Sequence, residues 1–234
     1  MEPSVIERFD KWAAEGAAHR GGVFRSEYMV RLEQLLPKEC KCSAETGCGK
    51  STVLFSNISK RHIVFSLDDR QDESSSVLFY EECPITKIDR VELVPGPTQL
   101  TLPNYEFTEK LDIVLIDGPH GYPFPELEYF YFYPWIKPGG ILIIDDVNIA
   151  SIGRLANFVA EDEMFEFVEL VISTAVFKRT EAPVFDPLAG DGWLRQRYNR
   201  HRVSPDRLEY LAEGPGDKIS SNAVDRIVYG EDEA

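Results

Sequence analysis

The sequence predicts an α/β protein in which helices cover both faces of a mostly parallel sheet. Strand-like and helix-like segments alternate from residue 40 to about residue 160, a pattern typical of right-handed βαβ crossovers. Residues 111–116 and 141–144 are short, almost wholly apolar runs, as expected of strands buried on both faces of a parallel sheet. The segments 165–171 and 174–178 lie only about two residues apart. That connection is too short for a parallel crossover, so the sheet should end in an antiparallel hairpin.

Two helices are expected before the alternating region. The first covers residues 4–19 with an amphipathic pattern and is broken by Gly21-Gly22. The second covers residues 26–36, starts at Ser26, which is a suitable N-cap, and ends before Pro37.

The alternating region supplies the sheet and its helices. We expect strands at 40–45, 62–67, 90–94, 111–117 and 140–145, and helices near 50–59, 74–82, 123–135 and 149–160. The strand at 40–45 is weaker than the others because Lys41, Ser43 and Glu45 interrupt its apolar pattern. We therefore expect N-terminal helices over 1–38 that pack on or cap the core, a central domain over 39–180, and a C-terminal appendage over 181–234.

Composition limits the class of protein. With 234 residues, 43% of them hydrophobic, the chain can form one well-buried domain. Its net charge of −15 should repel phosphate backbones, so we expect no nucleic-acid partner. No secretory signal and no apolar stretch of the roughly 20 residues that cross a bilayer is present, which predicts a cytoplasmic protein without a membrane partner. Four cysteines without paired zinc spacing are expected as free thiols: Cys40, Cys42, Cys48 and Cys83.

The stretch from Ala44 to Thr52, Ala-Glu-Thr-Gly-Cys-Gly-Lys-Ser-Thr, admits two incompatible interpretations. From Ala44 it fits a loose phosphate loop, in which backbone N–H groups cradle phosphates while Lys50 and Ser51 reach the terminal phosphate and Mg²⁺. From Glu45 it is an acidic residue followed by Gly-x-Gly, the turn that binds the methionine and ribose portion of S-adenosylmethionine. The first interpretation makes a nucleotide hydrolase or kinase, and the second makes a methyltransferase.

Features further along the chain favour the second interpretation. Gly47 and Gly49 would let the backbone approach a ligand without a Cβ atom in the way. The strand at 62–67 is followed by Asp68-Asp69, 23 residues after Glu45, where an acid can accept both hydroxyls of a ribose. A phosphate-binding site has no use for a carboxylate there. The turn that ends at Thr98 could border an adenine.

Four motifs follow one another in the chain: Glu45-Thr-Gly-Cys-Gly-Lys-Ser-Thr52, Ser66-Leu-Asp-Asp69, Ile116-Asp-Gly-Pro-His-Gly-Tyr122 and Ile136-Lys-Pro-Gly-Gly-Ile-Leu-Ile-Ile-Asp-Asp146. Together they resemble the class I S-adenosylmethionine-dependent methyltransferases over about residues 40–180. The nearest group is the small-molecule O-methyltransferase-like one with an Ile-Asp-Gly-x-His motif. The resemblance implies a Rossmann-like methyltransferase fold with a seven-stranded, mostly parallel sheet that ends in an antiparallel hairpin.

The resemblance also implies a cofactor site for S-adenosylmethionine in the domain at 39–180. The residues implied in cofactor binding are Glu45, Thr46, Gly47, Gly49, Ser51, Asp68, Asp69, Thr98, Asp117 and His120. Lys50 departs from the pattern, since many members carry a small or neutral residue there. We expect Lys50 to be a solvated lysine at the start of a helix.

Three carboxylates are expected at the carboxyl edge of the sheet, Asp117 after the fourth strand and Asp145 and Asp146 after the fifth. Such hard oxygen ligands suit Mg²⁺, which would orient an acceptor hydroxyl and lower its pKa. Alternatively, Asp117 and Asp145 cap the following turns and helices or accept the donor's amino group. His120 has a pKa range that suits a general base, or it is a loop residue bonded to backbone. Asp117 and His120 are thus the candidate catalytic residues.

The sequence therefore predicts a methyltransferase that acts on a small-molecule hydroxyl, such as that of a sugar or natural product, with or without help from Mg²⁺. Tyr122 and Phe124 are candidates to line the acceptor pocket. A phosphate-loop NTPase that uses Gly49-Lys50-Ser51 and a non-catalytic binding protein with the methyltransferase fold stay open as alternatives. The identity of the acceptor and the formation of a homo-oligomer are equally open.

Overall fold

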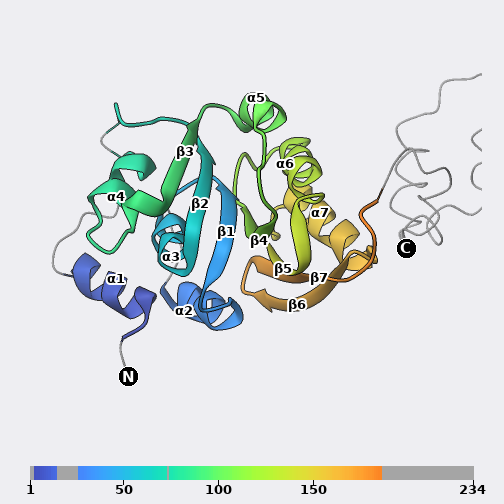
Figure 1. Ribbon diagram of the computed structural model, residues 1–234, viewed down its shortest axis with the longest axis horizontal. Coiled ribbons are helices and arrows are strands. Elements are labelled where there is room, and N and C mark those ends of the chain that lie inside the picture. The colour runs from blue at the N-terminus through green and yellow to red at the C-terminus, as the bar shows by residue number, and fades with distance from the viewer. Residues whose placement is uncertain (1–2, 15–25, 73, 186–234) are drawn as a thin grey trace, which may run out of the picture.

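A single seven-stranded sheet forms the centre of the protein (Figure 1). The computed structural model describes residues 3–14 and 26–185, apart from residue 73. The strand order is β3-β2-β1-β4-β5-β7-β6. The strands are β1 (Cys40–Thr46), β2 (Ser59–Ser66), β3 (Val91–Pro95), β4 (Leu111–Ile116), β5 (Ile136–Ile144), β6 (Phe165–Val171) and β7 (Thr174–Arg179).

The first five strands are parallel, and β7 runs antiparallel to both β5 and β6. The predicted parallel sheet with a terminal hairpin is therefore confirmed. The chain leaves β1 toward β2 on one side and reaches β4 on the other, so the strand order reverses between β1 and β4. Ligands of open α/β sheets bind beyond the carboxyl ends of the strands at such a switch point.

Helices cover both faces of the sheet, as the alternating pattern predicts. They are α1 (Val5–Ala14), α2 (Ser26–Leu35), α3 (Lys50–Ile58), α4 (Ser76–Glu82), α5 (Thr98–Thr101), α6 (Phe124–Phe132) and α7 (Ala150–Glu161), with the short 3₁₀ helices η1 (Ile88–Arg90) and η2 (Leu102–Asn104). Among the described residues, no helix is long and apolar enough to span a lipid bilayer.

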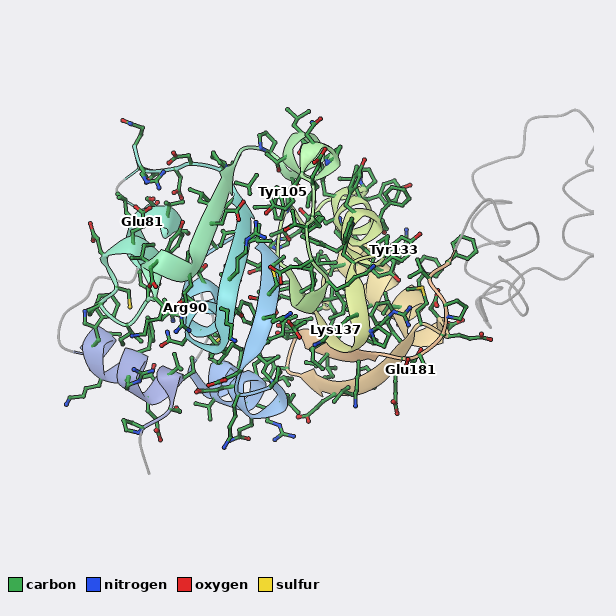
Figure 2. The ribbon with its side chains drawn as sticks, in the orientation of Figure 1. Glu81, Arg90, Tyr105, Tyr133, Lys137 and Glu181 are labelled. Atoms are coloured by element: carbon green, nitrogen blue, oxygen red, sulfur yellow. The ribbon has the colours of Figure 1, made fainter. Side chains whose placement is uncertain are left out.

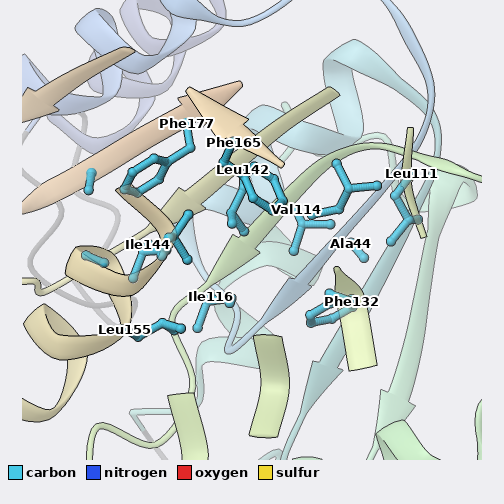
Figure 3. Packing of buried hydrophobic residues seen from close by; sticks show 14 of the residues in the cluster. Ala44, Leu111, Val114, Ile116, Phe132, Leu142, Ile144, Leu155, Phe165 and Phe177 are labelled. Atoms are coloured by element: carbon cyan, nitrogen blue, oxygen red, sulfur yellow. The ribbon is translucent and has the colours of Figure 1, made fainter. Parts of the chain in front are cut away.

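Each face of the sheet has its own hydrophobic cluster. On one face, residues of α1, α2 and α3 pack against β4 and β5. On the other face, Phe132 of α6 and Leu155 of α7 pack against Val114 and Ile116 of β4 (Figure 3). Burying one such aliphatic or aromatic side chain stabilises the fold by roughly 1.5–3 kcal/mol. Every residue of β4 is buried, as its apolar run predicts, so β4 lies in the middle of both clusters.

A buried carboxylate joins three strands at the amino edge of the sheet. Asp112 of β4 accepts hydrogen bonds from the N–H groups of Lys41 (2.9 Å) and Cys42 (3.0 Å), and it forms an ion pair with Lys137. Lys137, which Figure 2 labels, belongs to β5. Burial would raise the pKa of Asp112, but Lys137 and the two N–H groups hold it below its usual range. The strand β5 begins earlier than predicted because Ile136 pairs with Leu111, so the Lys-Pro-Gly-Gly segment is part of the strand.

Three sequence-based expectations need correction or extend beyond the described residues. The strand at 40–45 is not a weak one, because Ser43 and Glu45 are fully buried and hydrogen bonded inside the central strand β1. The first helix was expected over 4–19; it runs to Ala14, and residues 15–19 lie outside the described part of the chain. Residues 186–234, most of the predicted appendage, also lie outside it.

Candidate active site

A cavity of about 520 Å³ opens at the carboxyl ends of β1 to β4, at the switch point of the sheet. Its walls come from the turn after β1, the end of β2 and the loop behind it, the turns after β3 and β4, and the starts of α4, α5 and α6. The lining residues are Gly47, Cys48, Phe65, Ser66, Leu67, Asp69, Ser76, Gly96, Pro97, Thr98, Gln99, Asp117, Pro119 and Phe124.

The glycine turn after β1 lies against the end of β4. Gly47 has a φ of +78°, in the left-handed region that favours glycine, and its N–H donates to the carbonyl of Phe65 (3.0 Å). A Cβ at Gly47 would lie 2.4 Å from the backbone oxygen of Asp117. The turn can therefore approach β4 only because residue 47 has no side chain.

Glu45 lies directly beneath this turn and is fully buried. One carboxylate oxygen, Oε1, accepts hydrogen bonds from Thr52 of α3 and from Nε2 of His62 (3.1 Å). The other oxygen, Oε2, has no hydrogen-bond partner among the described residues. A buried carboxylate oxygen without a partner is costly.

Lys50 does not point toward the cavity, and the expectation that it is a solvated lysine is wrong. Its side chain is buried, and its ammonium lies 5.7 Å from the centre of the Phe9 ring of α1. Burial lowers the pKa of Lys50, and the charge of Asp10 opposes this effect. A phosphate loop needs this lysine beside the phosphates, so its position against α1 disfavours the nucleotide-hydrolase alternative.

The two aspartates after β2 have different surroundings. Asp68 is exposed and pairs with Arg70 (2.6 Å) on the surface. Asp69 lines the cavity and accepts hydrogen bonds from the Ser75 hydroxyl (2.5 Å) and from the N–H of Ser76 (3.0 Å) at the start of α4. Burial would raise the pKa of Asp69, but these hydrogen bonds hold it below its usual range. Asp69 is therefore an ionised acceptor held beside the cavity.

The carboxyl ends of β4 and β5 bring together a second group of charged side chains. The Nε2 atom of His120 lies 3.8 Å from Oδ1 of Asp117 and 3.4 Å from Oδ2 of Asp146. One ligand atom from each of these three residues lies within 4.8 Å of the others. Asp145 is not part of this group; its carboxylate is buried and accepts a hydrogen bond from Thr174 of β7. The predicted convergence thus holds for Asp117 and Asp146, with His120 in place of Asp145.

The electrostatics of this group favour a positive charge. Burial raises the pKa of Asp117 to about 7, although His120 opposes the change. The hydrogen bond to Asp117 raises the pKa of His120, burial opposes this effect, and the charges of Asp117, Asp146 and Asp145 add to the rise. A cation placed among the three side chains would relieve the repulsion between the two carboxylates.

Glu128 of α6 lies behind the turn after β4, a position that the sequence did not indicate. It is fully buried; Oε2 accepts a hydrogen bond from Thr46 (2.7 Å), and the same Thr46 hydroxyl accepts the N–H of Asp117 (3.1 Å). A Cβ at Gly118 would lie 2.1 Å from its carboxyl group. Burial raises the pKa of Glu128 to about 7. Nothing in the sequence indicated this buried position, because Glu128 is simply a charged residue within a helix rich in aromatic residues.

The predicted cofactor residues fall into two sets in the structure. Gly47, Asp69, Thr98 and Asp117 line the cavity. The others lie outside its lining; they are Glu45, Thr46, Gly49, Ser51, Asp68 and His120. Phe124 lines the cavity, whereas Tyr122 is exposed outside it.

Comparison with known proteins indicates the kind of domain that contains this cavity. Residues 44–147 match a family model described as a methyltransferase domain. These residues form a methyltransferase domain. The match includes the glycine turn, both aspartates after β2 and the charged group at the ends of β4 and β5. No curated protein sequence matches this methyltransferase significantly.

Solved structures share the fold of this methyltransferase at low sequence identity. An O-methyltransferase from Bacillus cereus in complex with S-adenosylhomocysteine has a TM-score of 0.53 at 16% identity, covering 77% of this chain and 92% of that one. The O-methyltransferase TomG from Streptomyces achromogenes, in complex with S-adenosylmethionine, has a TM-score of 0.53 at 15% identity, covering 77% and 91%. The mycinamycin methyltransferase MycE, in complex with Mg and S-adenosylhomocysteine, has a TM-score of 0.50 at 15% identity, covering 76% and 55%. At such identities these likenesses establish the fold.

Proposed function

We propose that this methyltransferase transfers the methyl group of S-adenosylmethionine to a hydroxyl of a small molecule, such as a sugar or natural product. The observation that carries the proposal is the cavity at the switch point between β1 and β4, with the glycine turn on one side and Asp69 on another. Similar folds hold S-adenosylmethionine or S-adenosylhomocysteine in solved structures, which supports the same ligand here. When bound, S-adenosylmethionine supplies a methyl group on a positively charged sulfur.

The polar groups around the cavity suit this donor. Asp69 is the ionised acceptor that lines the cavity, so we assign the ribose hydroxyls to Asp69 rather than to Asp68, which is engaged by Arg70 on the surface. The buried oxygen of Glu45 that has no partner suits a positively charged amino group beneath the turn. Thr98, which is buried in the cavity wall, belongs to the turn that we expect to border the adenine.

The transfer itself is an in-line displacement. A bond forms between the acceptor oxygen and the methyl carbon while the carbon–sulfur bond breaks, which leaves S-adenosylhomocysteine and an O-methyl product. The acceptor hydroxyl must lose its proton, and we propose that His120 takes it, with Asp117 and Asp146 stabilising the imidazolium that results. Holding donor and acceptor in line can supply roughly 7–11 kcal/mol of the barrier reduction.

We further propose that Asp117 and Asp146 bind a divalent cation together with His120. The donor set consists of two carboxylates and one imidazole, which suits a divalent ion with mixed oxygen and nitrogen ligands, including Mg²⁺ held through the carboxylates. Such an ion would bind the acceptor hydroxyl and lower its pKa. A bound ion would then supply the activation of the hydroxyl that the imidazole otherwise provides. Activity after chelation with EDTA, and again after Mg²⁺ is added back, distinguishes the two routes.

Calorimetry with S-adenosylhomocysteine and with ATP tests the donor assignment. We expect the first to bind and the second not to bind. Asp69→Asn should weaken S-adenosylhomocysteine binding at least about tenfold, because hydrogen bonds to charged groups contribute roughly 1.5–3 kcal/mol. Asp68→Asn is the matched control and should leave the affinity unchanged. Binding of ATP alone, or equal affinities in both variants, would refute the assignment. Failure to transfer methyl to any hydroxyl compound would leave a binding protein.

A further inference from the structure

A row of polar side chains crosses the core between β1, β2 and α3. We call Cys40, Ser43, Glu45, Ser59 and His62 the polar row. Sγ of Cys40 lies 3.1 Å from Oγ of Ser59, which lies 2.6 Å from Oγ of Ser43. Oγ of Ser43 lies 2.8 Å from Nδ1 of His62, and Nε2 of His62 lies 3.1 Å from Oε1 of Glu45. Cys40 is 8% exposed and the other four are fully buried.

The direction of the hydrogen bonds in the polar row follows from Glu45 when the imidazole of His62 carries one proton. A carboxylate can only accept, so Nε2 of His62 carries the proton. In the neutral ring Nδ1 then accepts from the hydroxyl of Ser43. Ser43 in turn accepts from Ser59, and Ser59 accepts from the thiol of Cys40. Every hydrogen bond between Cys40 and His62 is therefore donated in the direction of His62, and His62 itself donates one hydrogen bond to Glu45.

Glu45 connects the polar row with the glycine turn that lines the cavity. Thr52 donates to Oε1 of Glu45 and accepts the N–H of Gly49 (2.9 Å). Oε1 thus receives hydrogen bonds from two directions, from β2 through His62 and from α3 through Thr52. This leaves Oε2 free of partners among the described residues. The hydrogen bonds from His62 and Thr52 thus fix the orientation of the carboxylate within the fold.

The packing around His62 supports a positioning role. The ring lies 5.3 Å from the ring of Phe55 on α3, tilted by 51°, and is closed off from solvent. A buried polar cluster stabilises a fold no better than well-packed apolar side chains would, so its value lies in the geometry that it imposes. In this chain, that geometry ends at the carboxylate beneath the glycine turn.

We propose that His62 is a positioning residue for the methyl donor: its Nε2–H holds the buried carboxylate of Glu45, and the polar row holds the ring. The proposal rests on the function proposed above, in which Glu45 receives the positively charged amino group of the donor. The contact that matters for donor binding is the one from Nε2 to Glu45. The contact from Nδ1 to Ser43 orients the ring and does not itself reach the donor site.

Two substitutions separate the contacts of the ring. The side-chain amide of glutamine reaches the position of Nε2, and that of asparagine reaches the position of Nδ1. His62→Gln should therefore keep the bond to Glu45, and His62→Asn should keep only the bond to Ser43. We expect S-adenosylhomocysteine to bind His62→Gln within about threefold of the native affinity. We expect His62→Asn to bind at least about tenfold more weakly, as for the loss of a hydrogen bond to a charged group.

Isothermal calorimetry on the full chain measures these affinities, and thermal unfolding verifies that each variant is folded. Equal affinities in the two variants, or a loss in His62→Gln as large as in His62→Asn, would overturn the positioning role. A native protein that fails to bind S-adenosylhomocysteine would instead refute the proposed function. If His62→Asn does not fold, ¹⁵N spectra of the native protein decide. We expect a protonated Nε2 and an unprotonated Nδ1, and the opposite tautomer would overturn the proposal.

Discussion

Replacing Glu128 by glutamine should make the protein more stable above neutral pH. Glu128 is fully buried in α6, and its Oε2 accepts a hydrogen bond from Thr46. Burial raises its pKa from the ordinary 4.5 to about 7. Glutamine has the same shape and keeps an oxygen that can accept from Thr46, but it carries no charge at any pH. The substitution therefore isolates the cost of ionising this carboxyl inside the fold.

The sign and size follow from proton linkage. Below pH 4.5 the carboxyl is protonated in both the folded and the unfolded chain, so its contribution to stability is fully present. Between 4.5 and about 7 the unfolded chain is ionised while the folded chain keeps its proton, so stability falls as pH rises. Above about pH 7 the loss is complete, and a change of this size corresponds to roughly 3 kcal/mol.

Urea unfolding at pH 4.5, 6 and 8 measures the effect in Glu128→Gln and in the native protein. We expect the variant to gain up to roughly 3 kcal/mol relative to the native protein between the lowest and the highest pH. Contributions of other groups are common to both proteins and cancel in the difference. The exposed Glu82 of α4 supplies a control, since Glu82→Gln removes the same charge from the surface rather than from the core. A Glu128→Gln difference that does not vary with pH would refute the reasoning.

Three further predictions concern other parts of the site. Gly47→Ala should destabilise the fold by roughly 1–3 kcal/mol or more and abolish S-adenosylhomocysteine binding, because φ is +78° and the new Cβ would lie 2.4 Å from the backbone oxygen of Asp117; normal binding by calorimetry would contradict this. Lys50→Met should leave the affinity for S-adenosylhomocysteine within about twofold of the native value, since the lysine faces α1. A large loss of affinity would instead indicate that Lys50 contacts the ligand. Thr174→Val should lower the free energy of unfolding by roughly 1–3 kcal/mol in urea, since it removes the hydrogen bond to the buried carboxylate of Asp145. An unchanged unfolding midpoint would contradict the burial of that pair.

The order of strands and helices could be predicted because periodicity and connection length fix it locally. The run Leu111–Ile116 is apolar at nearly every position, and the structure buries all of it. The short link before Thr174 allowed only an antiparallel partner, and β7 is antiparallel to β5 and β6. These features depend on residues close together in the sequence.

The environment of the polar residues could not be predicted in the same way. Ser43 and Glu45 interrupt an apolar pattern, yet they are buried because His62 from the neighbouring strand and Thr52 from α3 supply their hydrogen bonds. Lys50 lies against α1 because the N-terminal helix covers it, which no local pattern indicates. In each case the partner comes from another element, so the sequence alone does not show it.

The same distinction applies to the charged group. Strand order placed Asp117, Asp145 and Asp146 at one edge, and the structure brings Asp117 and Asp146 together with His120. Asp145 instead accepts a hydrogen bond from Thr174, a partner from the antiparallel strand β7. The choice between neighbouring aspartates therefore depends on a contact across the sheet.

The half-buried thiol of Cys48 gives the cavity a chemical reporter. Burial raises the pKa of Cys48 to about 12, although a hydrogen bond to Ser66 opposes the change, so very little reactive thiolate exists at neutral pH. Cys40, Cys42 and Cys83 are buried in the core, away from the cavity lining. Slow alkylation of the folded protein at Cys48 would therefore be blocked by an occupant of the cavity, while modification of the other three requires the fold to open. Mass spectrometry of the labelled chain would read cavity occupancy and global opening in one experiment.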